Sequence, residues 1–308
     1  MEKKKVIIDC DPGHDDAVAL VLAARSPELE LVGVTCVAGN ADLENTARNA
    51  LGICALAGLR DVPICKGMDR PMFGDLITAP SVHGRSGLDG ADIPEPDLTF
   101  APDHAVDFLV KTLMASDRDI TLIPTGPLTN VAMAFLREPR IKEKIAKIVL
   151  MGGALGAGNV TPSAEFNIFV DPEAARIVFN AGVPLMMVGL DVTRKALLTR
   201  DHIAALQGRG TPVTDIFTGL LTFYLNAMSE LGYPQGGAVH DACALAAVCD
   251  PSLITTQLMH VDVETRGELT RGRTVCDTRS VTGETPNASV GLDIDSDRFF
   301  NLLLDRLY

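Results

Sequence analysis

The chain has 308 residues, 47% of them hydrophobic, and its 27 basic against 40 acidic side chains give a formal net charge of −13. This length and apolar fraction suffice for one large domain or two smaller ones. The acidic excess repels phosphate backbones and anionic lipids, and no basic run occurs beyond the lysines at positions 3–5, so neither nucleic acid nor a membrane is expected as a partner.

The cysteines and the N-terminus indicate the compartment. Seven cysteines are scattered along the chain, an odd number without a C-x-x-C pair, which is typical of reduced and mostly buried thiols. The apolar run at 6–8 is far too short for a signal peptide or a membrane span. A cytoplasmic protein is therefore expected.

Short apolar runs alternate with segments of helical periodicity along most of the chain. Buried strands are predicted at 6–9, 31–39, 120–124, 148–153 and 184–191. Helices are predicted between them at 16–27, 44–58, 105–116 and 171–182. This alternation predicts an α/β fold, with an open, mostly parallel, doubly wound sheet and helices on both faces.

The last third of the chain is less regular. A helix is predicted at 214–231, and added strands are predicted at 260–265 and 288–295. No internal repeat, low-complexity segment or long linker interrupts the sequence. Residues 1–308 are therefore expected to form a single large domain, in which a few C-terminal elements are added to the sheet.

Polar side chains follow nearly every predicted strand where it ends: Asp9 and Asp11, Asn40, Thr125 with Asn130, Asn159, and Asp191. Loops are polar in any protein, so a single such residue means little. In open α/β sheets, however, ligands bind at the carboxyl ends of the strands. Polar residues after successive strands therefore favour a site at that edge of the sheet.

The stretch DCDPGHDD, residues 9–16, has four carboxylates within eight residues. Two unit charges about 4 Å apart repel by roughly 4 kcal/mol at an effective dielectric of about 20. Asp9 and Asp11 point to one face of a strand end, while Asp15 and Asp16 open a helix, where either one could be a helix cap. A cap needs one carboxylate, and four converging oxygen ligands instead indicate a site for Ca²⁺ or Mg²⁺.

Two further clusters could join this site. His240 and Asp241 open an apolar helix after a Gly-Gly loop, where they are either a simple cap or a metal ligand beside a proton donor. Asn159, Glu165 and Asn167 precede another helix start. Amides and an acid suit a polyhydroxylated ligand because sugar hydroxyls both donate and accept, although ordinary loop polarity is the alternative.

With these stretches in hand, the sequence resembles the inosine-uridine preferring nucleoside hydrolases over essentially its whole length. The motifs that carry the resemblance are DCDPGHDD, VAGN, IPTGPLTN, VLMGG, AEFNIFVDPEAA and VHD, in the family order. Within the family, the chain is most similar to the bacterial pyrimidine-specific ribonucleoside hydrolases. The resemblance implies hydrolysis of uridine and cytidine to ribose and free base, with Ca²⁺ in the pocket.

The resemblance also assigns roles to individual residues. It implies that Ca²⁺ is held by Asp11, Asp16, the backbone carbonyl of Thr125, and Asp241. Asp11 would be the general base on a calcium-bound water, with Asp9 supporting it from behind. Ribose would be bound by Asp15, Asn40, Asn159, Glu165 and Asn167. The base would be surrounded by His83, Met151, Phe166 and His240, of which His240 is the candidate for assisting the departing base.

Two features bear on the substrate. The chain has no Trp, which excludes a purine sandwiched between indoles. Tyr224 and Tyr233 precede His240 and could contact the base, although simple packing is the alternative. The segment 73–90, which carries His83, resembles a mobile lid over the pocket, and the stretch 223–238 is expected to cover the base.

Three other functions stay open at this point. A non-specific or purine-tolerant hydrolase would share the chemistry, and a non-catalytic nucleoside-binding protein would share only the pocket. A metal-dependent phosphohydrolase is disfavoured because no basic cluster lies near the motifs. The resemblance also implies a homo-oligomer, expected to be a tetramer.

Overall fold

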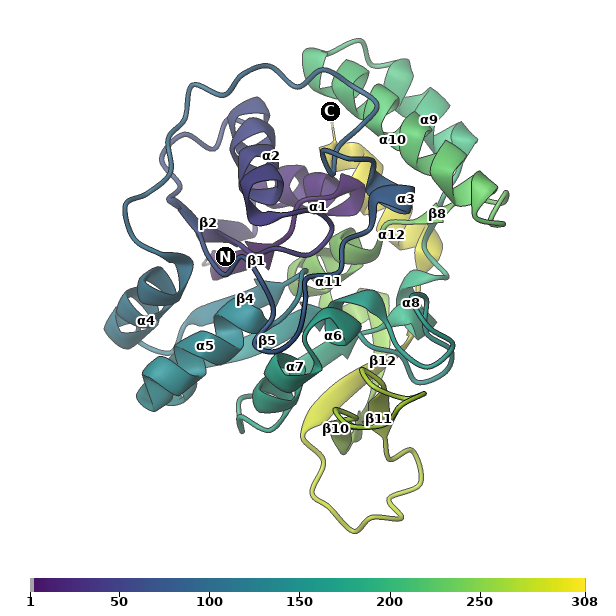
Figure 1. Cartoon of the computed structure of the whole chain (residues 1–308). Coiled ribbons are helices and arrows are strands. Elements are labelled where there is room, and N and C mark those ends of the chain that lie inside the picture. Colours follow the sequence, from purple (N-terminus) through teal and green to yellow (C-terminus); the bar gives the residue numbers. More distant parts are fainter. Residues whose placement is uncertain (1–2, 308) are drawn as a thin grey trace.

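A computed structural model describes residues 3–307 of the chain. Its centre is an eight-stranded sheet in the order β3-β2-β1-β4-β5-β6-β12-β9. The strands are β1 Lys4–Cys10, β2 Leu29–Cys36, β3 Ile64–Lys66, β4 Ile120–Pro124, β5 Ile145–Met151, β6 Leu185–Val188, β9 Ile254–Met259 and β12 Ala288–Ile294. Neighbouring strands pair in parallel from β3 to β12, and β9 is added antiparallel at the edge (Figure 1).

Helices cover both faces of this sheet, as the alternation in the sequence predicts. The helices are α1 His14–Ala24, α2 Leu43–Leu56, α3 Pro80–His83, α4 Ala105–Ala115, α5 Thr129–Arg137, α6 Phe166–Val170, α7 Pro172–Phe179, α8 Leu190–Thr193, α9 Arg200–Gln207, α10 Pro212–Glu230, α11 His240–Cys249 and α12 Ser296–Arg306, with 3₁₀ turns at Pro139–Lys144 and Pro251–Leu253. Val6 and Ile8 of β1 face a core with α1, α2, α10, α11 and α12, whereas Ile7 faces one with α4, α5 and α7.

The strand order positions the site. In the order 3-2-1-4-5-6 the chain reverses direction across the sheet between β1 and β4, and ligands bind at such a switch point outside the carboxyl ends of the strands. Asp9 of β1 pairs in register with Pro124 of β4. The loops that follow these strands carry Asp11 and Thr125, and the N–H of Thr125 donates to the carbonyl of Asp9 over 2.8 Å.

Several element boundaries differ from the predicted ones, and the ends of two strands are examples. β2 ends at Cys36 and β6 at Val188, several residues before the predicted ends of 31–39 and 184–191. The register explains both, because Cys36 is the last residue of β2 paired with β3, and Val188 is paired with Met151, the last residue of β5. The remainder of the predicted strand 184–191 opens α8.

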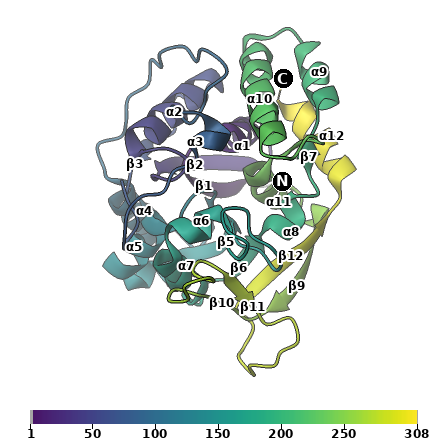
Figure 2. The same cartoon turned by 45° about the vertical axis from the view of Figure 1, so that its right-hand side comes forward.

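The predicted C-terminal strands have different fates. Residues 288–295 supply β12 of the main sheet, whereas the prediction at 260–265 yields β10 Val261–Val263, paired with β11 Thr274–Cys276 in a separate hairpin. Figure 2 shows this hairpin at the edge of the molecule, with the loop between β11 and β12 projecting from the body. β7 Leu197–Leu198 and β8 Gly237–Ala238 form another small pair.

Two further expectations concern the thiols and the membrane. All seven cysteines are free, and all but Cys276 are buried. None of the helices within residues 3–307 combines the length and the apolar composition needed to cross a bilayer.

Candidate active site

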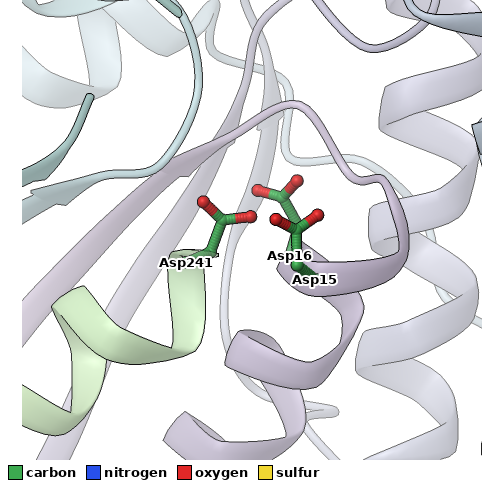
Figure 3. Close-up of side chains that lie close together, drawn as sticks. All are labelled: Asp15, Asp16 and Asp241. Atoms are coloured by element: carbon green, nitrogen blue, oxygen red, sulfur yellow. The ribbon is translucent and has the colours of Figure 1, made fainter. Parts of the chain in front are cut away.

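The floor of the site is a group of carboxylates at the starts of two helices. β1 ends at Cys10, and the Pro-Gly turn after Asp11 leads into α1, whose first turn carries Asp15 and Asp16. α11 packs beside α1 and carries Asp241 in its own first turn. Carboxylate oxygens of Asp15, Asp16 and Asp241 lie within 4.8 Å of one another, pointing toward a common space (Figure 3).

Hydrogen bonds hold some of these oxygens and leave others free. Asp16 accepts from the N–H of Gly13 at 3.1 Å and from the hydroxyl of Thr125 at 2.8 Å. Asp11 Oδ2 accepts from the N–H of Asn40 at 2.7 Å. Asp11 Oδ1 and Asp15 Oδ1 are buried without a hydrogen-bond partner within residues 3–307. A buried charged oxygen without a partner is costly, so these two atoms call for a cation or a ligand.

Asp9 lies behind this group. Its Oδ1 accepts from the hydroxyl of Thr35 at 2.6 Å and from the side-chain amide of Asn130 at 2.8 Å. Asn130 is one of the polar residues that follow the predicted strands, and in the structure its side chain supports Asp9. Asp9 therefore stiffens the end of β1 from below the other carboxylates.

Burial and mutual repulsion determine the charge of the floor. Burial raises the pKa of Asp9 to about 7, and burial with the charge of Asp16 raises the pKa of Asp15 to about 7. The pKa values of Asp11 and Asp241 are raised well above the usual range for the same two reasons. Crowded oxygen ligands whose charges are unfavourable on their own fit a hard divalent cation, and the group can hold a metal ion.

A cavity of about 380 Å³ opens above the floor. This volume lies in the range of small-molecule sites. Of the residues named from the sequence, its lining contains Asp15, Asn40, His83, Thr125, Met151, Asn159, Glu165, Phe166, Asn167, Tyr224, Tyr233, His240 and Asp241. Asp11 and Asp16 lie buried beneath it. The structure thus brings together residues spread over 230 positions of sequence, from Asp11 to Asp241.

One wall of the cavity is built around the start of α6. Glu165 caps this helix, accepting from the N–H groups of Asn167 and Ile168, and it also accepts from the N–H of Gly153 at 2.9 Å. Burial raises the pKa of Glu165 to about 6 despite these donors. Asn167 Nδ2 donates to the carbonyl of Thr125 at 2.6 Å, which connects this wall to the floor.

The opposite wall carries two histidines and a tyrosine. His240 Nδ1 lies 2.7 Å from the hydroxyl of Thr193, and the hydroxyl of Tyr224 donates to the carbonyl of Ala238 at 2.7 Å. His83 Nδ1 accepts from the N–H of His14 at 3.3 Å and lies 3.1 Å from His14 Nδ1. The Tyr224 hydroxyl is therefore engaged within the protein, although Tyr224 is also part of the cavity lining.

His14 and Arg194 are among the residues near the cavity that the sequence reasoning missed. His14 lies inside the DCDPGHDD motif, where it is buried and stacked against His83 and Tyr224. The motif was interpreted from its four carboxylates, so no role was predicted for His14. Arg194 lines the cavity directly. No motif or spacing marks Arg194, because its contacts are with backbone carbonyls far away in sequence.

Comparison of the sequence with known families identifies the family of the chain. Residues 6–301 match the family described as inosine-uridine preferring nucleoside hydrolase. The chain belongs to this family. It is therefore a hydrolase that acts on the N-glycosidic bond of nucleosides.

Individual nucleoside hydrolases agree with this assignment. The chain is 47% identical over 303 residues, 98% of its own length and 96% of the relative, to the pyrimidine-specific ribonucleoside hydrolase RihB of Escherichia coli O157:H7. A solved structure of a purine-preferring ribonucleoside hydrolase from Gardnerella vaginalis superposes with a TM-score of 0.94 at 36% identity, covering 99% and 98% of the two chains. The plant nucleoside hydrolase PpNRh1 gives the same TM-score at 32% identity and the same coverage.

Proposed function

We propose that this enzyme hydrolyses the N-glycosidic bond of pyrimidine ribonucleosides, uridine and cytidine, to ribose and the free base. The observation that carries the proposal is the floor of buried carboxylates beneath a cavity with amide side chains in its walls. Carboxylates favour the positive charge that develops at C1′ as a glycosidic bond breaks. The pyrimidine preference is supported by the RihB relative, at 47% identity over 98% of this chain.

Asp11 is the proposed general base. Its Oδ2 is held by the N–H of Asn40 2.7 Å away, whereas its buried Oδ1 has no hydrogen-bond partner within residues 3–307. A carboxylate with one fixed and one free oxygen is oriented to take a proton from the water that attacks C1′. Asp9 is proposed to maintain this orientation by fixing the end of β1, from which the chain continues to Asp11.

Ca²⁺ is the proposed cation, held by the carboxylates of Asp11, Asp16 and Asp241 and by the carbonyl of Thr125. All of these ligands are oxygen atoms, which Ca²⁺ prefers. The ion supplies charge neutralisation for the carboxylates and lowers the pKa of a coordinated water. Thr125 can still contribute, because a carbonyl has two lone pairs and Asn167 uses one of them.

The ribose is proposed to be bound by Asp15, Asn40, Asn159, Glu165 and Asn167. The side-chain carbonyl of Asn159 accepts from the N–H of Phe166 at 2.9 Å, which leaves its Nδ2 as a donor for a ribose hydroxyl. Glu165 is fixed by backbone N–H groups, so its position does not depend on the ligand. Such prearranged polar groups reduce the entropy cost of positioning the sugar.

The base is proposed to lie among His83, Met151, Phe166 and His240, with Tyr224 and Tyr233 at the same wall. His240 Nδ1 lies against the Thr193 hydroxyl, so its Nε2 is the nitrogen available to protonate or hydrogen-bond the departing base.

A second candidate is a purine-tolerant ribonucleoside hydrolase. The observation that favours it is the G. vaginalis structure, a purine-preferring enzyme that superposes over 99% of this chain. Nearly the same backbone therefore accommodates a purine preference in that protein, and side chains around the base must decide between the two.

Ribose release from uridine, cytidine, inosine and adenosine, each measured with and without a chelator, tests these proposals. Chelator-sensitive release from uridine or cytidine and little from the purines is the expected result. Comparable release from inosine would replace the pyrimidine preference by the purine-tolerant candidate. Folded, calcium-loaded protein that binds nucleosides without releasing ribose would be a binding protein instead.

The resemblance to the family is also what supports a homotetramer, and the free thiols support a cytoplasmic location. Sedimentation velocity at enzyme concentrations used in the assay would measure the assembly directly.

A further inference from the structure

The short helix α8 and the residue after it contact two walls of the cavity at once. Thr193 lies 2.7 Å from His240 Nδ1 through its hydroxyl. Asp191 Oδ2 accepts from the N–H of Leu155 at 2.6 Å. Arg194, which caps the helix, donates from Nη1 to the carbonyl of Ala157 at 2.9 Å and from Nη2 to the carbonyl of Gly158 at 2.6 Å. The same turn of chain therefore holds the His240 wall and the loop that leads to Asn159.

The side chains of that loop offer little packing to hold it in place. Its sequence at 152–158 is GGALGAG, so that Leu155 is its only large side chain. Glycine-rich backbone loses much conformational freedom on ordering, and small side chains contribute little packing. The position of the loop thus depends on polar contacts, and two successive carbonyls match the planar fork of a guanidinium.

The next residue, Asn159, is a proposed ribose ligand. Its backbone N–H donates to the carbonyl of Ala164 at 3.1 Å, and its side-chain carbonyl accepts from Phe166. Gly158, whose carbonyl Arg194 binds, is packed so tightly that an added Cβ would lie 2.1 Å from the carbonyl oxygen of Ala164. A shift of the loop at Gly158 would therefore move Asn159 and its outward amide with it.

We propose that Arg194 is a positioning residue of the reaction, whose guanidinium fixes the loop so that Asn159 presents its Nδ2 to the ribose. The proposal rests on the proposed function for the role of Asn159. Among the cavity-lining residues that the structure describes, Arg194 is the sole lysine or arginine. Its guanidinium is therefore also the permanent positive charge among these lining residues.

Lys195 offers a matched control, because it is the next residue of the same turn. Its Nζ donates to the carbonyl of Leu292 at 2.9 Å and to Asp293 at 2.8 Å, so it too joins a cation to a backbone carbonyl, but toward β12. Arg194→Met and Lys195→Met remove equal charges from adjacent positions. An effect of net charge or of general stability would appear in both variants.

Hydrogen exchange tests the contact independently of any activity. In Arg194→Met, the amides of Gly158 and Asn159, which donate to the carbonyls of Pro162 and Ala164, should exchange about tenfold faster. In Lys195→Met their exchange should match the wild type. Unchanged exchange in Arg194→Met would overturn the proposal even if the enzyme proved to have no nucleoside hydrolase activity.

A double-mutant cycle with Asn159→Ala tests the functional step. Arg194→Met should lower kcat/KM for the best ribonucleoside about tenfold in the wild type, but less than twofold in the Asn159→Ala background. Arg194→Lys should recover the activity only in part, because an ammonium keeps the charge but loses the fork. Additive losses, or complete recovery with lysine, would contradict a role through Asn159, whereas absent turnover in the wild type would refute the proposed function itself.

Discussion

The floor and the walls of the cavity are built in different ways. The floor is formed at the end of β1 and the starts of α1 and α11, and its carboxylates are fully buried or nearly so. Most of the walls come from the segments 73–90, 152–167 and 223–240, which also carry exposed apolar side chains, such as Ile77 at 41% and Leu231 at 46% exposure. The sheet thus fixes the groups proposed for chemistry, while loops and helix ends present the groups proposed for recognition.

This difference has a consequence for mutation. A change in the floor removes a group for which the fold holds no substitute, whereas a change in a wall shifts one contact among several. We therefore expect losses of several orders of magnitude in the floor and modest effects in the walls.

The largest effect is expected for Asp11→Asn. The amide has nearly the shape of the carboxylate and can still accept from the N–H of Asn40, but it cannot take a proton from water. Turnover should fall by at least about a thousandfold with an unchanged circular dichroism spectrum.

The control for this prediction is Asp42→Asn, which alters an exposed aspartate that caps α2 and should leave turnover unchanged. Retention of more than a few per cent of the wild-type rate in Asp11→Asn would remove Asp11 from the role of base.

The next effect in size concerns the metal. Asp241→Asn removes one of the charged oxygens that meet at the floor, so Ca²⁺ affinity measured by calorimetry should weaken by about 10- to 100-fold. Glu173→Gln, at a partly buried ion pair with Arg271 outside the cavity lining, is a suitable comparison and should bind Ca²⁺ as the wild type does. Equal affinities in both variants would place the ion elsewhere.

The floor was also the part most accessible from the sequence. DCDPGHDD and the His-Asp pair at the start of α11 are local patterns, in which strand ends and helix starts follow from short apolar runs. Their meeting point depends on the strand order that makes β1 and β4 neighbours, and periodicity does not determine that order. The resemblance to the family supplied this information.

The structure also contains elements that no sequence pattern indicated. β9 was not predicted, because four of its six residues are exposed and it lacks the apolar alternation of a half-buried strand. The contacts of Arg194 were equally hidden, since they join its side chain to carbonyls 36 and 37 positions away. Side chain to backbone contacts over such distances leave no residue pattern at either end.

A smaller effect of the floor is expected in the pH dependence of the free energy of unfolding. Burial raises the pKa of Asp9 and of Asp15 from 3.8 to about 7, so the folded protein retains protons that the unfolded chain releases. This contribution to stability is fully present below about pH 4 and is lost as the pH rises through about 7, by up to about 1.4 kcal/mol per pKa unit and group. A cation held by Asp11, Asp16 and Asp241 should reduce the effect, because a nearby positive charge lowers the pKa of Asp9 and Asp15.

The measurement is the free energy of unfolding by urea between pH 5 and 8, once with a chelator and once with saturating Ca²⁺. Groups that do not respond to the ion contribute equally to the two curves and cancel in their difference. This difference should therefore grow with pH. Parallel curves would mean that the floor carboxylates do not respond to the ion.

The smallest effect is expected in the wall, for Tyr224→Phe. The hydroxyl donates to the carbonyl of Ala238, so its loss should lower the free energy of unfolding by about 1 kcal/mol while turnover changes less than threefold. Tyr233→Phe, at an exposed ring, should leave the free energy of unfolding unchanged. A large loss of turnover in Tyr224→Phe with little loss of stability would show that the hydroxyl leaves Ala238 to act on the ligand, and the wall would then share in the chemistry that we assign to the floor.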